Sequence, residues 1–509
     1  MIRTAATALI AFSLCALPAC AQEHQHAAPE KLGKVSFTTT CDARVQASFN
    51  RAVALLHSFA YAPAAEAFQK VADEDPGCAM AHWGAAMSYY HQLWEPALPG
   101  DALQKGRAEL ELAKKTAKPS AREQEYLAAA GLVFNDAEGP YPVRAGKYRD
   151  AMATLAKKYP QDTEAQIFYA LALLSTASPQ DKTHSNQKAA GAILEPLYKQ
   201  YPQHPGLAHY IIHAYDNAEL AARGEKAARE YALIAPSAPH ALHMPSHIFT
   251  RLGMWNDSIR MNQAARTAAH QQGDIGEELH AMDYLVYAWL QENREADAAA
   301  LLQELKAMGP FKASEAKVFY AATAMPIRYA VERKQWKDAV QCTAPEGAPP
   351  HVIALAAWAR ALGHARAGEA DAAKAEAEIV RKMAEKLRDA GNLYWAGQVQ
   401  IQAHEASAWI AWAEHKPEDA LKFMRSAADE EDAVEKLPVT PGPVAPAREQ
   451  LGDMLLLAGQ PAAALTEYEK SLKGSPGRRG ALQGAMKSSH DAGLSSKTAY
   501  YQALLQKQN

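Results

Sequence analysis

Leu451-Gly-Asp-Met-Leu-Leu-Leu-Ala-Gly-Gln-Pro-Ala-Ala-Ala-Leu-Thr-Glu-Tyr-Glu-Lys-Ser-Leu-Lys-Gly-Ser-Pro476 is the stretch that shows most clearly how this chain is built. Small residues at Gly452 and Ala464 allow two helices to pack closely, and Tyr468 fills the gap between them. Gly459 supplies the turn between the helices, because glycine tolerates the left-handed backbone that such turns need. The stretch therefore predicts a helix-turn-helix unit that ends near Pro476.

Weaker copies of this unit recur along most of the chain. The first runs from Phe49 to Pro76, and Pro160, Pro202 and Pro236 each follow one amphipathic helix and precede the next. Proline ends a helix at such a boundary because it lacks an amide proton and clashes with the preceding turn. The sequence therefore predicts an all-α solenoid of roughly ten stacked helix pairs.

These repeats resemble the tetratricopeptide repeat (TPR) family over most of the chain. Some stretches are more specifically similar to a group of exported bacterial TPR proteins: Val53-Ala-Leu-Leu-His-Ser-Phe59, Cys78-Ala-Met-Ala-His-Trp-Gly84, Ala238-Pro-His-Ala-Leu-His-Met-Pro-Ser-His-Ile-Phe249 and Val439-Thr-Pro-Gly-Pro443. The resemblance implies a right-handed superhelix whose first helices line a concave binding groove. It implies no particular reaction.

Composition excludes several classes of partner. The 509 residues carry 53 Lys and Arg against 57 Asp and Glu, which gives a net charge of −4. This balance leaves no basic stripe that would displace counterions from phosphates, so we expect no nucleic-acid partner. Beyond the N-terminal segment no apolar run reaches the roughly 18 residues that a spanning helix needs, so we expect no transmembrane span.

The N-terminus has the pattern of an export signal. Arg3 precedes an apolar stretch, residues 5–17, that is too short to cross a bilayer. Cleavage after Ala21 fits the small-x-small rule, whereas Leu17-Pro-Ala-Cys20 resembles a lipoprotein box that would leave Cys20 acylated as an outer-membrane anchor. In either case we expect residues 1–21 to act as a signal peptide and the mature chain to reach the bacterial periplasm.

The rest of the chain divides by composition. Residues 22–40 are polar and aperiodic and are expected to form a flexible linker, residues 41–436 carry the repeat array, and residues 448–509 form a C-terminal repeat and tail. Between the last two, residues 437–447 hold four prolines, a density that precludes a helix and favours an extended segment. We interpret this segment as a spacer, the alternative being a strap over the groove.

Export makes disulfides possible, because they persist in oxidising compartments. Cys41 and Cys78 either join the N-terminal arm to the end of the first repeat or remain free and buried, since spacing alone does not show proximity. Cys342 has no evident partner.

Two His-x-x-x-His pairs are the strongest functional signal. His209 and His213 each precede their counterparts, His243 and His247, by 34 residues, the length of one TPR repeat. Residues i and i+4 share one helix face, and in the TPR family these positions point into the groove. Because packed helices lie about 8–10 Å apart, the four imidazoles can converge on one ion or on a closely spaced pair.

Neutral imidazole is a ligand for zinc, copper and iron, so the four histidines form a candidate transition-metal site. Asp216 lies on nearly the same face as His213 and is a candidate extra ligand, base or acceptor that fixes a histidine tautomer. His240, His280 and Asp283 are also expected on the inner face of the array.

Two hypotheses about function remain open. Repeat grooves often carry polar residues at these positions to grip a partner, and Pro245 can disturb the helix of the second pair. The leading hypothesis is therefore a scaffold that binds a protein, a peptide or a small ligand in its groove. The alternative is a metal-binding protein, or a metal-dependent oxidase or hydrolase. No phosphate-binding glycine loop, nucleophile elbow or dinucleotide fingerprint indicates any other chemistry.

The other histidines are expected to be structural. His57, His82 and His91 lie among aromatic residues and are interpreted as buried, hydrogen-bonded core histidines. Those at positions 184, 204, 270, 351, 364, 404, 415 and 490 are expected at the surface or at helix ends.

Overall fold

The computed structural model describes residues 30–93, 98–116, 119–311 and 316–508. The predicted signal peptide with Cys20, and residues 22–29 of the predicted linker, lie outside the described residues. The described residues form α-helices and two short 3-10 helices, and contain no strand. The expected all-α fold is confirmed.

The helices up to residue 251 are η1 (Ala43–Val45), α1 (Gln46–His57), α2 (Tyr61–Glu74), α3 (Ala79–Met87), α4 (Gly100–Ala113), α5 (Ala121–Phe134), η2 (Asp136–Glu138), α6 (Tyr141–Lys158), α7 (Thr163–Ser175), α8 (Ser185–Gln200), α9 (Pro205–Tyr215), α10 (Ala221–Ile234), α11 (Pro239–His243) and α12 (Pro245–Arg251). Those that follow are α13 (Trp255–Gln272), α14 (Ile275–Gln291), α15 (Glu295–Met308), α16 (Ala316–Glu332), α17 (Trp336–Ala339), α18 (Pro350–Arg366), α19 (Ala370–Asp389), α20 (Leu393–Ala413), α21 (Pro417–Asp432), α22 (Ala447–Leu457), α23 (Pro461–Gly474), α24 (Arg479–Asp491) and α25 (Ser495–Gln506).

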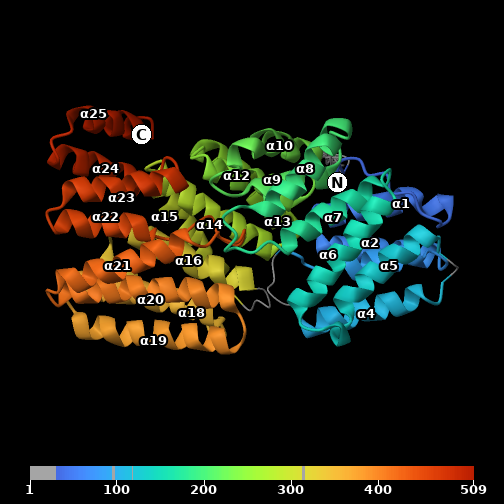
Figure 1. The fold of residues 1–509 in the computed structure, drawn as a ribbon, viewed down its shortest axis with the longest axis horizontal. Coiled ribbons are helices and arrows are strands. Elements are labelled where there is room, and N and C mark those ends of the chain that lie inside the picture. Colours follow the sequence, from blue (N-terminus) through green and yellow to red (C-terminus); the bar gives the residue numbers. More distant parts are fainter. Residues whose placement is uncertain (1–29, 94–97, 117–118, 312–315, 509) are drawn as a thin grey trace, which may run out of the picture. The chain divides into compact units, whose positions relative to one another are not determined.

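Successive helices pack on one another in pairs. α1 packs on α2, α9 on α10 and α22 on α23, and each pair also contacts the next helix along the chain. Figure 1 shows this arrangement for α18–α25, which lie side by side as a stack of helices. The described chain is thus a TPR-like array of helix pairs, as its repeats predict.

The repeat unit at the C-terminus owes its close packing to the small residues that the sequence places there. A Cβ atom added to Gly452 would lie 2.7 Å from the Tyr468 ring, so α22 and α23 could not approach as they do with a larger residue. Ala464 is completely buried between them, and Gly459 makes the turn with a φ of +70°. These contacts match the roles predicted for the three small residues.

Residues 31–40 pack against the repeats although they lie in the range expected to be a flexible linker. Leu32 and Phe37 are buried, and Phe37 meets the Trp83 ring edge-on at 5.6 Å between centroids. The Lys34 amide donates to the Gln203 carbonyl oxygen over 2.8 Å. This part of the N-terminal arm is therefore fixed in place, because two apolar side chains among its polar residues find places in the core.

A disulfide joins Cys41, at the end of this arm, to Cys78, immediately before α3. From the sequence, a disulfide and a pair of free, buried thiols were both possible. Cys342 is a free, partly buried cysteine.

Residues 435–446, between α21 and α22, cross over distant helices, and we call them the strap. The Glu435 amide donates to the Pro179 carbonyl oxygen (2.8 Å), and the Leu437 amide donates to the Tyr394 hydroxyl oxygen (3.0 Å). These bonds reach the loop after α7 and the start of α20. The proline-rich segment is therefore a strap rather than the spacer that we expected, because its backbone groups are tied to remote parts of the fold.

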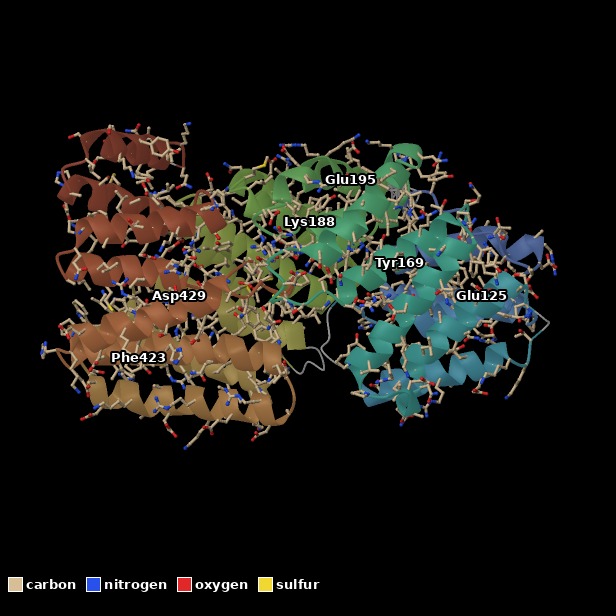
Figure 2. All side chains as sticks on the ribbon, viewed as in Figure 1. Glu125, Tyr169, Lys188, Glu195, Phe423 and Asp429 are labelled. Atoms are coloured by element: carbon tan, nitrogen blue, oxygen red, sulfur yellow. A yellow bond between two sulfur atoms is a disulfide. The ribbon has the colours of Figure 1, made fainter. Side chains whose placement is uncertain are left out.

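Charged side chains also link neighbouring helices. Asp429 on α21, labelled in Figure 2, pairs with Arg448 on α22. Arg448 also donates to Glu467 on α23 over 2.8 Å, so one guanidinium group joins three consecutive helices. Among the described residues, no helix is both long enough and apolar enough to cross a membrane.

Candidate metal centre

The helices α9, α11, α12 and α14 bring the predicted histidines together. His209 and His213 lie on α9, and His243 and His247 lie on either side of the junction between α11 and α12. Met244 at that junction keeps helical φ and ψ values of −52° and −36°, so Pro245 occupies the first turn of α12, where proline is tolerated. The i,i+4 relation of the second pair therefore survives the proline.

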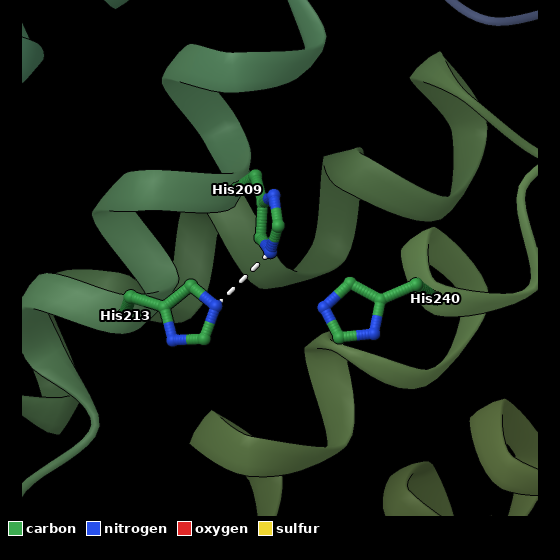
Figure 3. A group of neighbouring side chains, drawn as sticks. All are labelled: His209, His213 and His240. Carbon is green, nitrogen blue, oxygen red and sulfur yellow. Dashed lines mark hydrogen bonds between the residues drawn. The ribbon is translucent and has the colours of Figure 1, made fainter. Parts of the chain in front are cut away.

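The histidines form two clusters of three. His209 and His213 are joined by His240, and we call these the first histidine cluster; Figure 3 shows it. A second histidine cluster contains His243, His247 and His280. In each cluster three ring nitrogens lie within 4.8 Å of one another. The rings of His213 and His247, one from each cluster, have centroids 6.3 Å apart. The histidines are thus arranged as two neighbouring sets of three, which suits a closely spaced pair of ions better than one ion bound by four histidines.

The tautomers of His243 and His247 are fixed by their hydrogen-bond partners. His243 Nδ1 lies 2.6 Å from Asn262 Oδ1, and the amide nitrogen of Asn262 donates to the Ser258 carbonyl oxygen (2.8 Å), so the oxygen must face His243. His247 Nδ1 lies 2.9 Å from the Asp216 carboxylate. Both acceptors require a proton on Nδ1, which leaves Nε2 of each neutral ring with a lone pair.

These two Nε2 atoms lie 3.0 Å apart. Two lone pairs at this distance repel each other unless a cation lies between them. Two ligand nitrogens at about 2.0–2.1 Å from one ion lie about 2.9 Å apart at right angles and about 3.4 Å apart in a tetrahedron. The observed separation of His243 and His247 therefore fits two ligands of one transition-metal ion.

Burial disfavours a proton, rather than a metal ion, between the Nε2 atoms of His243 and His247. It lowers the pKa of His243 and of His280 well below the ordinary value, and it lowers the pKa of His247 to about 4 although Asp216 opposes the shift. The three side chains are at most 2% exposed. At neutral pH the second cluster is therefore uncharged, which is the state in which imidazole binds a metal.

The first cluster has a similar local order. His209 Nδ1 donates to the His57 carbonyl oxygen over 2.6 Å, so the lone pair of His209 lies on Nε2, which is 3.1 Å from His213 Nε2. His240 Nδ1 contacts Glu277 (3.1 Å), and Figure 3 shows that the His240 ring turns its other nitrogen toward the other two rings. Burial and the neighbouring imidazoles lower the pKa values of His209 and His213 well below the ordinary value.

The acidic residues that we considered as ligands take other roles. Asp216 bonds His247, and it also pairs with Arg251 (2.8 Å) and Lys436 (3.1 Å). Burial alone would raise the pKa of Asp216, but Lys436 and Arg251 hold it well below its usual range. Asp283 lies 3.5 Å from Arg328 and belongs to neither cluster. Asp216 therefore holds the His247 ring in one orientation.

A buried hydrogen-bond network contacts the first cluster through the His57 carbonyl group. Glu164 bonds His57 Nε2 (2.8 Å) and His204 Nε2 (2.9 Å), and burial encloses all three side chains. A Cβ atom on Gly206 would lie 2.6 Å from the His57 ring, so only glycine fits there. His57 is structural, as expected, and its carbonyl also orients His209. His204 was expected at the surface and is buried instead, with its Nε2 bonded to Glu164. Histidines 184 and 351 are likewise buried.

A cavity of about 510 Å³ opens beside the first cluster. His213, Asp216 and Asn217 line one part of it, and Lys436 of the strap lines another. His213 is partly exposed, whereas the other members of both clusters are buried. The first cluster therefore borders a space in which a small molecule fits, and the second does not.

The strap contacts residues that surround the second cluster. Lys436 reaches Asp216 (3.1 Å), the Tyr284 hydroxyl donates to the Thr440 carbonyl oxygen (3.3 Å), and buried Arg328 donates to the carbonyl oxygens of Gly442 (3.2 Å) and Pro443 (3.1 Å). The Tyr284 oxygen is also 3.4 Å from His247 Nε2. The strap thus covers the inner face beside the second cluster, where we expected an open groove, and leaves the cavity beside His213 open.

Several residues at the site were not found from the sequence. Asn262 lies on the second helix of its repeat, away from the positions that line a groove, and no motif marks it. Lys436 directly precedes the proline-rich segment, and Tyr284 directly follows Asp283. Glu277 lies three residues before His280, a helical spacing that would have suggested a carboxylate on the same face.

No family model matches the chain, and no curated protein matches it. Partly similar solved structures include the human IFIT1 dimer with m7Gppp-AAAA, which is 13% identical over 84% of this chain and 90% of that chain, with a TM-score of 0.34. The TPR domain of P58(IPK) is 13% identical over 89% of this chain and 100% of that chain, with a TM-score of 0.22. Ypp1 is 10% identical over 91% of this chain and 78% of that chain, with a TM-score of 0.42. We conclude nothing about ligand or partner from likenesses at this level.

Proposed function

We propose that this chain is a metal-binding protein built on a TPR-like helical scaffold, with a transition-metal ion held by His243, His247 and His280. The observation that carries the proposal is the 3.0 Å approach of two Nε2 lone pairs whose rings both donate through Nδ1. A ring of neutral nitrogen ligands without a thiolate suits zinc, copper or iron. We place this proposal ahead of the groove-binding hypothesis at the second cluster, because His243, His247 and His280 are at most 2% exposed and a partner in a groove could not reach them.

Tyr284 is placed to complete the coordination of this ion. Its hydroxyl oxygen lies 3.4 Å from His247 Nε2, and its ring centroid lies 4.7 Å from that of His243. Three imidazoles and the Tyr284 hydroxyl oxygen, whose proton is donated to Thr440, form a closed set of four donor groups, which is typical of structural sites rather than catalytic ones. We therefore propose a tightly held ion at the second cluster.

The test is the metal content of the mature chain, purified without a histidine tag. A His243→Gln/His247→Gln double variant keeps polar side chains of similar size but removes two ligands. His351→Gln is the matched control, because His351 is also a buried histidine, is stacked on Trp395 at 4.2 Å between centroids, and belongs to neither cluster. Mass spectrometry of bound metals before and after reconstitution measures the result.

We expect the double variant to contain about one equivalent of metal less than the wild type and the control variant to contain as much as the wild type. Circular dichroism checks that both variants are folded. A wild-type protein that stays metal-free after reconstitution, or a double variant with the full wild-type content, would refute the proposal.

We also propose that the protein acts in an oxidising compartment, the bacterial periplasm in the simplest case. The signal pattern of residues 5–17 and the Cys41–Cys78 disulfide both support this location. Thiol trapping in fractionated cells should find the pair oxidised in the periplasmic fraction, and recovery of the reduced protein from the cytoplasm would contradict the proposal. The mass of the mature N-terminus distinguishes cleavage after Ala21 from acylation of Cys20.

A further inference from the structure

We infer that the first histidine cluster holds a second metal ion, and that this ion takes an external oxygen or nitrogen ligand from the adjoining cavity. The inference rests on the proposed function and extends it, because it assigns different tasks to the two clusters. The second cluster encloses its ion, whereas the first presents its ion to small molecules.

The first cluster has the donor atoms for an ion of its own. The lone pair of His209 Nε2 faces His213 Nε2 at 3.1 Å, within the separation of about 2.9–3.4 Å that two nitrogens on one ion adopt. His240 comes from the neighbouring repeat and turns its ring toward the same point. The contact between His240 Nδ1 and Glu277 fixes that orientation (3.1 Å), as carboxylates often do for metal-bound imidazoles.

The first cluster also differs from the second in access. His213 lines the 510 Å³ cavity and is partly exposed, whereas His243, His247 and His280 are buried. Three histidines leave at least one coordination position of an ion open, and an open position is what separates reactive metal sites from structural ones. The side of the first cluster that carries His213 is the side on which the cavity lies, so the open position faces the cavity.

The cavity sets the class of ligand. Its volume suits a small molecule rather than a peptide, because drug-sized ligands occupy pockets of roughly 300–1,000 Å³. Asn217 and Ser175 provide hydrogen-bonding groups, and Leu174 and Tyr141 provide apolar surface. The fitting ligand is therefore a small, partly apolar molecule that binds the ion through an oxygen or nitrogen atom.

The experiment loads the protein with Cu²⁺ and follows its absorption and electron paramagnetic resonance spectra while azide is added. We expect two equivalents of copper in the wild type, of which only one changes its spectrum with azide. The His209→Gln/His213→Gln variant should lose one equivalent and the whole azide response. The His243→Gln/His247→Gln variant should lose the other equivalent and keep the response.

A second pair of variants tests the role of the cavity without touching a ligand. Gly146 lines the cavity on α6, and a Cβ atom there meets nothing within 4 Å. Gly146→Leu should weaken the binding of azide at least several-fold while both copper ions remain bound. Gly131→Leu is the control, since Gly131 is also helical with open space around it but does not line the cavity.

Each outcome bears on one proposal. A wild type that binds a single equivalent, lost in the His243→Gln/His247→Gln variant, would leave the proposed function intact and overturn this inference. An azide response that persists in the His209→Gln/His213→Gln variant, or that Gly146→Leu leaves unchanged, would also overturn it. Full copper content in the His243→Gln/His247→Gln variant would instead refute the proposed function.

Discussion

Single acceptor atoms decide what each histidine at this site can do. Asn262 Oδ1, the Asp216 carboxylate and the His57 carbonyl oxygen cannot donate, so each of them draws a proton to Nδ1 of the ring it contacts. The consequence is a lone pair on Nε2 of three imidazoles. The chemistry of the clusters is thus set by residues that are not themselves ligands.

Substitution of Asn262 tests this dependence. Asn262→Leu removes the acceptor for His243 Nδ1 while keeping a similar shape, and we expect metal affinity at the second cluster to fall by about 10- to 100-fold. Asn262→Asp supplies an acceptor again and should restore much of the affinity. Competition titration with a chelating dye measures both; equal affinities for the two variants would contradict the role of this side chain.

At the scale of helices and loops, the strap is the element that covers the second cluster. Its ion pair between Lys436 and Asp216 is largely buried, with side-chain exposures of 12% and 7%. Burial lowers the pKa of Lys436 to about 8, so the lysine is still mostly charged at neutral pH. Its other nearby ion pair, between Glu435 and Lys182, is more exposed and is therefore worth less.

Removal of the buried pair should loosen the strap. We expect Lys436→Gln to speed metal loss to a chelator at least several-fold, because the charge that holds the strap to Asp216 is gone. Lys182→Gln, which removes the exposed pair on the adjacent residue, should change the rate little. Stopped-flow release of metal measures both, and indistinguishable rates for Lys436→Gln and wild type would exclude the strap as a barrier.

The elements differ in how far the sequence predicts them. Helix pairs follow from residues such as Gly452, Ala464 and Pro476, because the repeat imposes small residues and helix ends at fixed places. The 34-residue spacing brings His213 near His247 for the same reason. The strap and the buried state of the histidines do not follow, since they depend on contacts between segments far apart in sequence, such as Tyr284 with Thr440, which no local pattern encodes.

At the scale of the whole molecule, the helices after α16 contain an acidic pair that makes stability depend on pH. Glu405 on α20 is buried and Glu431 on α21 is half-buried. Burial with the nearby carboxylates raises the pKa of Glu431 from 4.5 to about 7. Glu405, Asp432 and Glu449 face Glu431 as acidic neighbours, whereas Arg478 and the Ala447 amide oppose the shift.

The direction of this pH dependence follows from comparing the protonation of Glu431 in the folded and the unfolded chain. Below pH 4.5 Glu431 is protonated in both, so it adds no pH dependence. Between pH 4.5 and 7 the unfolded chain releases the proton while the folded chain keeps it, so stability falls as pH rises. We expect Glu431→Gln to gain stability over the wild type across this range, by on the order of 1–3 kcal/mol at pH 8. Urea unfolding at pH 4.5 and pH 8 measures the difference in unfolding free energy between the variant and the wild type. The same difference at both pH values would contradict the shifted pKa.

The disulfide affects stability at the other end of the array. It closes a loop between residues 37 apart, and a loop of this length corresponds to roughly 3–4 kcal/mol of lost entropy in the unfolded chain. The Cys41→Ser/Cys78→Ser variant should therefore melt at a lower temperature than the wild type, and dithiothreitol should shift the wild type in the same direction. Cys342→Ser, which removes the free cysteine, is the control and should change the melting temperature much less.

The position of the strap in the chain also dictates an order of events during biosynthesis. All six histidines precede residue 281, whereas the strap begins at residue 435. A chain that lengthens from its N-terminus completes both sets of ligands while the strap has not yet been made. If both proposals hold, an ion can reach the histidines before residues 435–509 have been made, and the strap then covers the second cluster when this last part of the chain folds.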